Sequence, residues 1–230
     1  MLTMNTLDGA KFKHNVITVN MKKQNQKPTY HHGDLKKALI DATLTLLQEE
    51  GYQSLSLRKI SKIAGVSQSA PYRHYEDVES LIADVAREGF KLLTGNLEKV
   101  RRKFTKFPLL QFRESGVSYV NFALKNPDLF QIMYGNQIQN HSKFNTLIAS
   151  EEETFQVLID IISDCQRAGI IETKNVQKTS MAAWTMVHGI AVLLLGKQVM
   201  FRSAHLKNAK NITKDLIEHL YLGLKIRKDL

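Results

Sequence analysis

The segment from Ser56 to Tyr75 most constrains the fold of this chain, because its pattern indicates two short helices joined by a tight glycine turn. Ser56 is a candidate N-cap, and Ile60 and Ala64 fall on one face of the helix that follows. Gly65 can adopt the positive φ that a sharp turn requires. This spacing predicts a helix-turn-helix, in which the second helix enters the major groove of DNA.

Pro71 lies inside the expected second helix, where proline ordinarily costs about 3 kcal/mol. With Ser67 as the N-cap, the lost hydrogen bond lies at the end of the helix rather than in its middle. Proline also biases the preceding residue, Ala70, away from α-helical geometry. We therefore expect a recognition helix of about two turns, with a distorted or 3₁₀-like first turn.

Polar side chains are concentrated in this motif. Gln68, Ser69 and Arg73 can reach base edges, since glutamine suits adenine and arginine suits guanine. Tyr72 and His74 are placed to hydrogen-bond phosphates, as are polar groups at the start of the preceding helix. The alternative for each side chain is a solvated helix face. The predicted DNA contacts are Ser56, Lys59, Ser67, Gln68, Ser69, Ala70, Tyr72, Arg73 and His74.

The composition agrees with such a role but does not prove it. The formal net charge of +10 suggests a polyanionic partner, although a solubilising charge is an equal alternative. The single cysteine, Cys165, excludes an internal disulfide framework and favours a reducing cytoplasm. The apolar run from Ile190 to Leu195 is far shorter than the roughly 20 residues of a membrane span. We expect a cytoplasmic protein without a signal peptide.

The remaining pattern predicts an all-α fold of about nine helices, with a three-helix N-terminal domain and a larger C-terminal bundle. Asp34 is the candidate N-cap of the first helix, and Gly51 ends it. Asp77 begins a connecting helix that extends to about Leu93. A basic segment, 98–106, is expected to separate the two halves. Later helices are predicted at about 108–125, 127 onward, 143–168, 175–198 and 206–227.

Three regions follow from this organisation: a disordered basic arm at 1–29, a DNA-binding domain at 30–93, and a bundle at 94–230. Whether translation begins at Met1 or at Met21 stays open. The lysines of the arm that can follow the DNA backbone or enter the minor groove are Lys22, Lys23 and Lys27.

Residues Tyr30 to Phe90 resemble the DNA-binding domain of the tetracycline-repressor (TetR) family. The resemblance rests on the opening YHHGDL, the SLR before the first motif helix, the AGVS turn and the APYRHY close. The later segment AAWTMVHGIAVLLLG resembles the branch named for a Trp-His-Gly signature, with Trp184, His188 and Gly189 at the matching positions. Two positions depart from the family. At the position of Val78 the family often has lysine, and at the position of Ser69 it often has glycine.

The resemblance implies a ligand-responsive, sequence-specific transcriptional regulator, and more narrowly a repressor released by a small molecule. It implies a homodimer through about 175–198 and 206–227, with two recognition helices on a near-palindromic operator in double-stranded DNA. The helix from Asp77 to about Leu93 would transmit the ligand signal. It implies no cofactor.

Large apolar residues on the expected bundle helices suggest a ligand pocket, although each one alone suits a packed core. Trp184 and His188 are four residues apart and share a helix face, so they either line this pocket or form a packed pair. The candidate pocket residues are Phe122, Phe130, Met133, Tyr134, Phe155, Trp184 and His188.

Two other classes of protein fit the sequence less well. An enzyme is disfavoured because no HExxH, phosphate-binding glycine loop or nucleophile elbow occurs in the sequence. A nonspecific DNA-binding protein would use the charge but would not need the helix-turn-helix. His31 and His32 lack partners at ligand spacing, so no metal site is expected.

Overall fold

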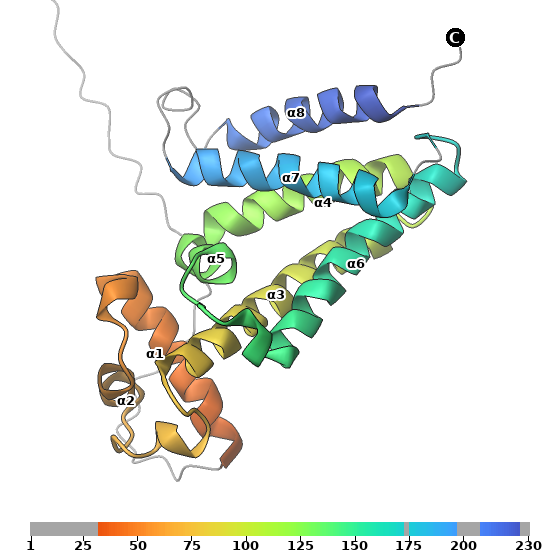
Figure 1. Cartoon of the computed structure of the whole chain (residues 1–230). Helices are drawn as coiled ribbons and strands as arrows, with labels where there is room; N and C mark the ends of the chain where they lie inside the picture. Colours follow the sequence, from red (N-terminus) through yellow and green to blue (C-terminus); the bar gives the residue numbers. More distant parts are fainter. Residues whose placement is uncertain (1–31, 173–174, 197–207, 226–230) are drawn as a thin grey trace, which may run out of the picture.

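The computed structural model of the protein describes residues 32–172, 175–196 and 208–225. The expected all-α class is confirmed, with eight α-helices rather than about nine in this described part (Figure 1). The α-helices are α1 (His32–Glu50), α2 (Leu57–Ala64), α3 (Val78–Lys103), α4 (Pro108–Lys125), α5 (Pro127–Tyr134), α6 (Asn145–Arg167), α7 (Val176–Leu195) and α8 (Ala209–Leu224). Three 3₁₀-helices join them: η1 (Tyr52–Ser54), η2 (Pro71–Arg73) and η3 (His141–Lys143). The predicted arm, 1–29, lies outside the described residues.

Most of the predicted helix ends are correct because they depend on local chemistry. Gly51 follows α1 with φ 77°. Ser56 accepts a hydrogen bond from the backbone N–H of Lys59 at 3.3 Å. Asp77 forms a capping box at the start of α3, accepting from the backbone N–H of Ser80 at 2.7 Å. Asp34 is an exception: α1 begins at His32, so the expected cap lies inside the helix.

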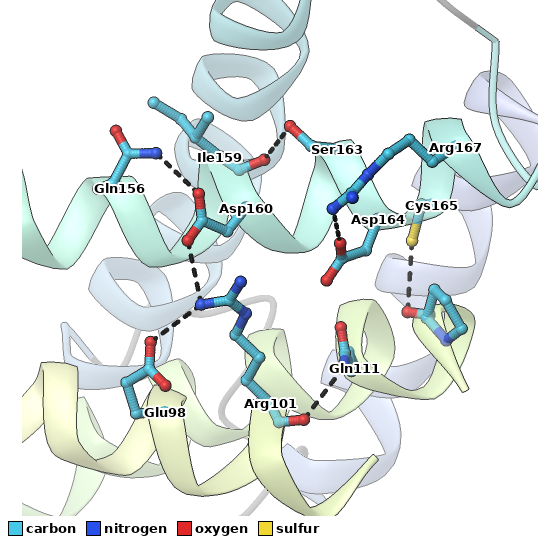
Figure 2. Close-up of polar contacts among 11 residues, drawn as sticks. Glu98, Arg101, Gln111, Gln156, Ile159, Asp160, Ser163, Asp164, Cys165 and Arg167 are labelled. Atoms are coloured by element: carbon cyan, nitrogen blue, oxygen red, sulfur yellow. Dashed lines mark hydrogen bonds and ion pairs between the residues drawn. The ribbon is translucent and has the colours of Figure 1, made fainter. Parts of the chain in front are cut away.

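The expected break after Leu93 is wrong, because α3 continues without interruption through 26 residues. At 1.5 Å per residue this is about 39 Å of rigid helix. Its last turn carries Arg101, whose Nη1 lies 3.0 Å from Asp160 Oδ2 and 3.4 Å from Glu98 Oε1 (Figure 2). Basic residues in the last turn also suit the helix dipole. The predicted domain boundary at 93/94 therefore falls inside one helix that both domains share.

The two ends of α3 belong to different packing units. Its first turns pack on α1, which also packs on α2, to complete the N-terminal domain at the bottom of Figure 1. Its later turns pack on α6 and α4, and α4 in turn contacts α7 and α8 across the top of the molecule. At Gly116 in α4 an added Cβ would lie 2.5 Å from Ile217 Cδ1 and 3.2 Å from Val187 Cγ1. This glycine lets α4 approach α7 and α8 closely.

Among the described helices, one is long and apolar enough to cross a membrane by length and composition, namely α7. The core helix of a soluble protein meets the same criterion, and α7 packs on α4, α6 and α8. Of the 18-residue stretch of α7 with the highest mean hydropathy, only 33% is buried. The helix α7 therefore has an outer apolar face.

Candidate functional site

The recognition segment, residues 67–75, differs from the expected two-turn helix. Residues 67–70 form a turn in which the backbone N–H of Ala70 donates to the carbonyl of Ser67 at 3.0 Å. The 3₁₀-helix η2 follows, and the N–H groups of His74 and Tyr75 both donate to the carbonyl of Pro71. The 3₁₀ expectation is confirmed. The expected bias at Ala70 is wrong, because its φ of −61° and ψ of −43° are α-helical.

The residues of this segment divide into a buried set, which packs on the core, and an exposed set, which we call the reading surface. Ala70, Pro71 and Tyr75 are buried, which explains how the proline is tolerated: it packs into the core at the first position of a short helix. Ala70 is only 8% exposed, so its side chain offers little surface to DNA, which counts against that predicted contact. The exposed residues are Ser67, Gln68, Ser69, Tyr72, Arg73 and His74.

The expected side-chain cap from Ser67 is absent from this turn. Its Oγ lies 3.2 Å from the hydroxyl of Ser69, so the two hydroxyls pair on the exposed surface. Val78, which stands where the family often has lysine, is half-buried and packs against the core. The valine therefore contributes packing at the first turn of α3 in place of a charge.

Tyr75 ties the recognition segment to α3 and α1. Its hydroxyl donates to Asp84 Oδ2 at 2.9 Å, and burial is the main cause of the raised pKa of this phenol. Asp84 also lies 2.6 Å from Lys36 Nζ and 2.9 Å from Arg87 Nε. Sequence reasoning missed Asp84, whose signal is a carboxylate between the buried residues Ala83 and Val85.

The start of α2 supplies two further predicted contacts. Ser56 uses its hydroxyl as the N-cap, as described above. Lys59 Nζ lies 2.7 Å from Glu50 Oε2, and both side chains are 49% exposed. Such an exposed pair contributes little to stability, so the lysine can exchange this carboxylate for a phosphate at small cost.

The bundle encloses a cavity of about 500 Å³ lined by residues from α3 to α8. Of the candidate pocket residues, Met133, Tyr134, Phe155 and Trp184 line it. The other three do not: Phe122 borders a separate hollow beside Lys210, and the rings of Phe130 and His188 pack against each other, with their centroids 5.4 Å apart. Lining residues that sequence reasoning missed include Phe90, Phe112, Tyr119, Glu151, Glu152 and Met181.

A cluster of rings forms one wall of the cavity. Tyr119 Oη lies 2.9 Å from His188 Nδ1, within hydrogen-bond distance. The His188 ring centroid is 5.1 Å from that of Trp184 and 4.8 Å from that of Tyr134. Burial lowers the pKa of His188 and raises that of Tyr134 to about 12. Trp184 therefore lines the cavity and packs against His188, which is not among the lining residues.

A loop connects the cavity directly to the DNA-binding domain. Gly135 and His141, at its two ends, line the cavity. Between them, the backbone N–H groups of Gln139 and Asn140 donate to Glu79 Oε1, at 2.6 and 3.3 Å. Glu79 lies in the first turn of α3, just after the recognition segment. This second connection, besides α3 itself, has no signal in the sequence because its donors are backbone groups.

Cys165 is expected to be unreactive in the native protein. It is 0% exposed, its thiol donates to the carbonyl of Pro108 at 3.3 Å (Figure 2), and burial raises its pKa to about 12. The thiolate that attacks disulfide reagents is therefore scarce and inaccessible at pH 8. We expect Ellman's reagent to label the native protein at least about 100-fold more slowly than the urea-unfolded protein. Equal rates would contradict the described burial.

The outer face of α7 carries a stripe that no other described part of the protomer covers. Val192 and Leu193 are 47% and 41% exposed, and Leu222 of α8 is 46% exposed. At Gly189, in the same stripe, an added Cβ would meet nothing within 4 Å. Within the described part of the chain, Gly189 therefore serves no close approach of another helix.

Comparison with known proteins agrees with this architecture. The structure is similar to that of a protein of unknown function from Rhodococcus sp. RHA1, with 27% identity, a TM-score of 0.75, and coverage of 87% of this chain and 100% of that one. It also resembles PfmR, a TetR-family transcriptional regulator from Thermus thermophilus, with 17% identity, a TM-score of 0.63, and coverage of 82% and 99% of the two chains. A regulatory protein of the tetR family from Rhodococcus RHA1 shares the fold at 14% identity, with a TM-score of 0.65 and coverage of 84% and 98%.

Two family models match the sequence. The model for bacterial regulatory proteins of the tetR family matches residues 39–85, which contain the helix-turn-helix. The model for the tetracyclin repressor-like C-terminal domain matches residues 112–216, which contain most of the bundle. Together they span more than half of the chain, in the same order as the two packing units. The family and the fold are those of transcriptional regulators rather than enzymes, and the chain belongs to the TetR family of DNA-binding regulators.

Proposed function

We propose that the protein is a dimeric repressor that binds a near-palindromic operator and leaves it when a small molecule enters the cavity. The observation that carries the proposal is the loop from Gly135 to His141. It lines the cavity and is hydrogen-bonded to Glu79, in the helix turn that follows the recognition segment. A change at one site is therefore transmitted to the other through few contacts.

The DNA-binding role rests on the exposed part of the recognition segment. Gln68, Ser69 and Arg73 are the proposed base contacts, and Tyr72 and His74 are proposed phosphate contacts together with Lys59. All six side chains are exposed in the N-terminal domain. The buried Pro71 holds the backbone of the recognition segment in place.

The proposed dimer interface is the outer face of α7 and α8. Exposed apolar side chains and Gly189 lie along one stripe of α7, and a glycine there permits two helices to approach closely. Two-fold symmetry would place the recognition segments about one DNA turn apart, as a near-palindromic operator requires.

The proposed transmission uses α3 and the loop together. A ligand that binds more tightly when the recognition segments are wrongly spaced shifts the dimer toward that form. The coupling is reciprocal and typically worth about 1–3 kcal/mol. Tyr75 and Asp84 hold the recognition segment on α3, so a displacement of this helix moves the reading surface with it.

Two narrower assignments belong to the same proposal. The Trp-His-Gly branch is supported by Trp184 at the cavity, His188 packed against Trp184 and Gly189 on the outer stripe of α7. A cytoplasmic location is supported by the family and by the need to reach DNA.

Selection of random duplex DNA on the purified protein at near-physiological salt tests the DNA-binding role. We expect enrichment of a palindrome whose half-sites lie about one helical turn apart. Enrichment of no sequence, with binding that vanishes as salt rises, would favour nonspecific electrostatic binding.

Replacing Glu79 with alanine is expected to uncouple the two sites. The variant removes the acceptor of two loop N–H groups, and a hydrogen bond to a charged group is worth about 1.5–3 kcal/mol. In the wild-type protein we expect operator DNA to change the emission of Trp184, the only tryptophan, because coupling is reciprocal.

In Glu79→Ala this response should fall to less than about half, in proportion to the lost coupling. Gln139→Ala is the matched control, because the backbone donor to Glu79 survives the replacement. An undiminished response in Glu79→Ala would exclude the two Glu79 hydrogen bonds as a route.

A further inference from the structure

The cavity has an unusual charge balance for a protein with a net charge of +10. Among the described residues that line it, the acidic and basic side chains are Glu151, Glu152 and His141, without a lysine or arginine. The cations of this basic protein therefore lie elsewhere, and the fixed charge of the described lining is negative.

The two carboxylates are neighbours in the early turns of α6, and both line the cavity. Glu151 is 31% exposed, and its Oε1 is 3.5 Å from His141 Nδ1. Burial raises the pKa of Glu151, His141 opposes this shift, and Glu152 adds to it. The carboxylate of Glu151 is thus partly desolvated and lies beside a second carboxylate. Both effects disfavour its negative charge, and an entering cation would stabilise that charge.

The rest of the cavity is apolar and rich in rings. Aromatic faces attract cations as well as apolar groups, and a desolvated cation–π contact is worth about 2 kcal/mol. A volume of about 500 Å³ is within the range of small-molecule sites. The aromatic residues that line it are Phe90, Phe112, Tyr119, Tyr134, Phe155 and Trp184.

We infer that the cavity binds an amphipathic organic cation, with its positive group at Glu151 and Glu152 and its apolar body among the aromatic rings. That this cation acts as the effector rests on the proposed function, whereas its binding to the cavity does not. An anionic amphiphile would place its charge beside two carboxylates, and the described lining has no lysine or arginine to pair with it. Repulsion between these negative charges is costly in a partly desolvated cavity.

Three probes with the same ten-carbon chain separate charge from apolar fit: decyltrimethylammonium, 1-decanol and decanoate. Trp184 lines the cavity and is the only tryptophan, so its emission reports binding to the full-length protein directly. At pH 8 we expect the cation to bind at least about tenfold more tightly than decanoate. Equal or tighter binding of decanoate would overturn the inference, as would the absence of any response to the cation.

Matched variants locate the charge. Glu151→Gln and Glu152→Gln are each expected to weaken binding of the cation by about fivefold and to leave 1-decanol unchanged. Glu153→Gln is the control: it removes the same charge from the next position of α6, which is exposed and does not line the cavity. Equal weakening in all three variants would show a general charge effect and would contradict the proposed site.

A parallel measurement of operator release separates this inference from the proposed function. If the cation binds with the expected charge dependence but leaves the operator bound, the ligand class stands and effector control by this ligand is wrong. If decanoate binds and releases the operator, the ligand class is wrong and the effector-controlled repressor stands.

Discussion

Leu193→Asp is expected to convert the proposed dimer into a monomer and to weaken operator binding by about 10²–10⁴-fold. That range is the avidity gained when two linked sites bind together, and it is lost when a monomer must bind one half-site alone. Leu193 lies on the outer stripe of α7 with 41% of its surface exposed. In the dimer its replacement would bury two unpaired carboxylates, which costs several kcal/mol.

Analytical ultracentrifugation and operator titration measure the two effects. Leu92→Asp is the matched control, because Leu92 is a helical leucine with 38% exposure, on α3 rather than on α7. We expect it to remain dimeric. A Leu193→Asp protein that is still a dimer with unchanged operator affinity would show that the interface lies elsewhere.

Arg73→Ala is expected to weaken binding to the selected operator by about 1–3 kcal/mol and to relax the preference at one position of each half-site. Arg73 ends η2 and is exposed, while the backbone beneath it is held by the buried Pro71 and Tyr75. Truncation should leave the fold intact, since this side chain is outside the core. Competition with single-base operator variants measures the loss of preference.

Lys59→Ala provides the contrasting result. It is expected to weaken binding to all sequences about equally and to lower the salt dependence, because a phosphate contact carries no base information. Since Lys59 pairs with Glu50, the double variant Glu50→Gln/Lys59→Ala removes the unpaired carboxylate as well. An Arg73→Ala protein that behaved like Lys59→Ala would reassign Arg73 to the backbone.

Local chemistry made the helix-turn-helix predictable. The ends at Ser56, Gly65 and Asp77 depend on hydrogen bonds to groups within three residues or on the positive φ of a glycine. Such interactions are the same in any tertiary context, so residue identity and spacing suffice. The resemblance to the TetR family added the expected function of these elements.

The recognition segment was only partly predictable. A 3₁₀ turn followed from the proline, but the extent of the helix did not, because it depends on what the segment packs against. Burial of Ala70, Pro71 and Tyr75 stabilises a short η2 over a longer helix. The same burial leaves the side chain of Ala70 with little exposed surface.

At the basic segment near Arg101, the helix is longer than predicted rather than shorter. This segment, 98–106, was expected to separate the two halves, yet α3 continues into it as far as Lys103. Arg101 pairs with Asp160 of α6, nearly sixty residues later in the chain, and its carbonyl accepts a hydrogen bond from Gln111 (Figure 2). Helix propensity is weak compared with such tertiary contacts, so the pattern alone misplaced the end of this helix.

The sequence by itself determined the helical class, the helix-turn-helix and the exposed polar residues near η2, because these follow from interactions between near neighbours. Tertiary structure alone decided which aromatic residues line the cavity, the negative charge of its described lining and the link from Gly135–His141 to Glu79. These features bring together residues from six helices, and one link uses backbone groups that any residue except proline possesses. Only the packing of the helices brings such groups within reach of one another.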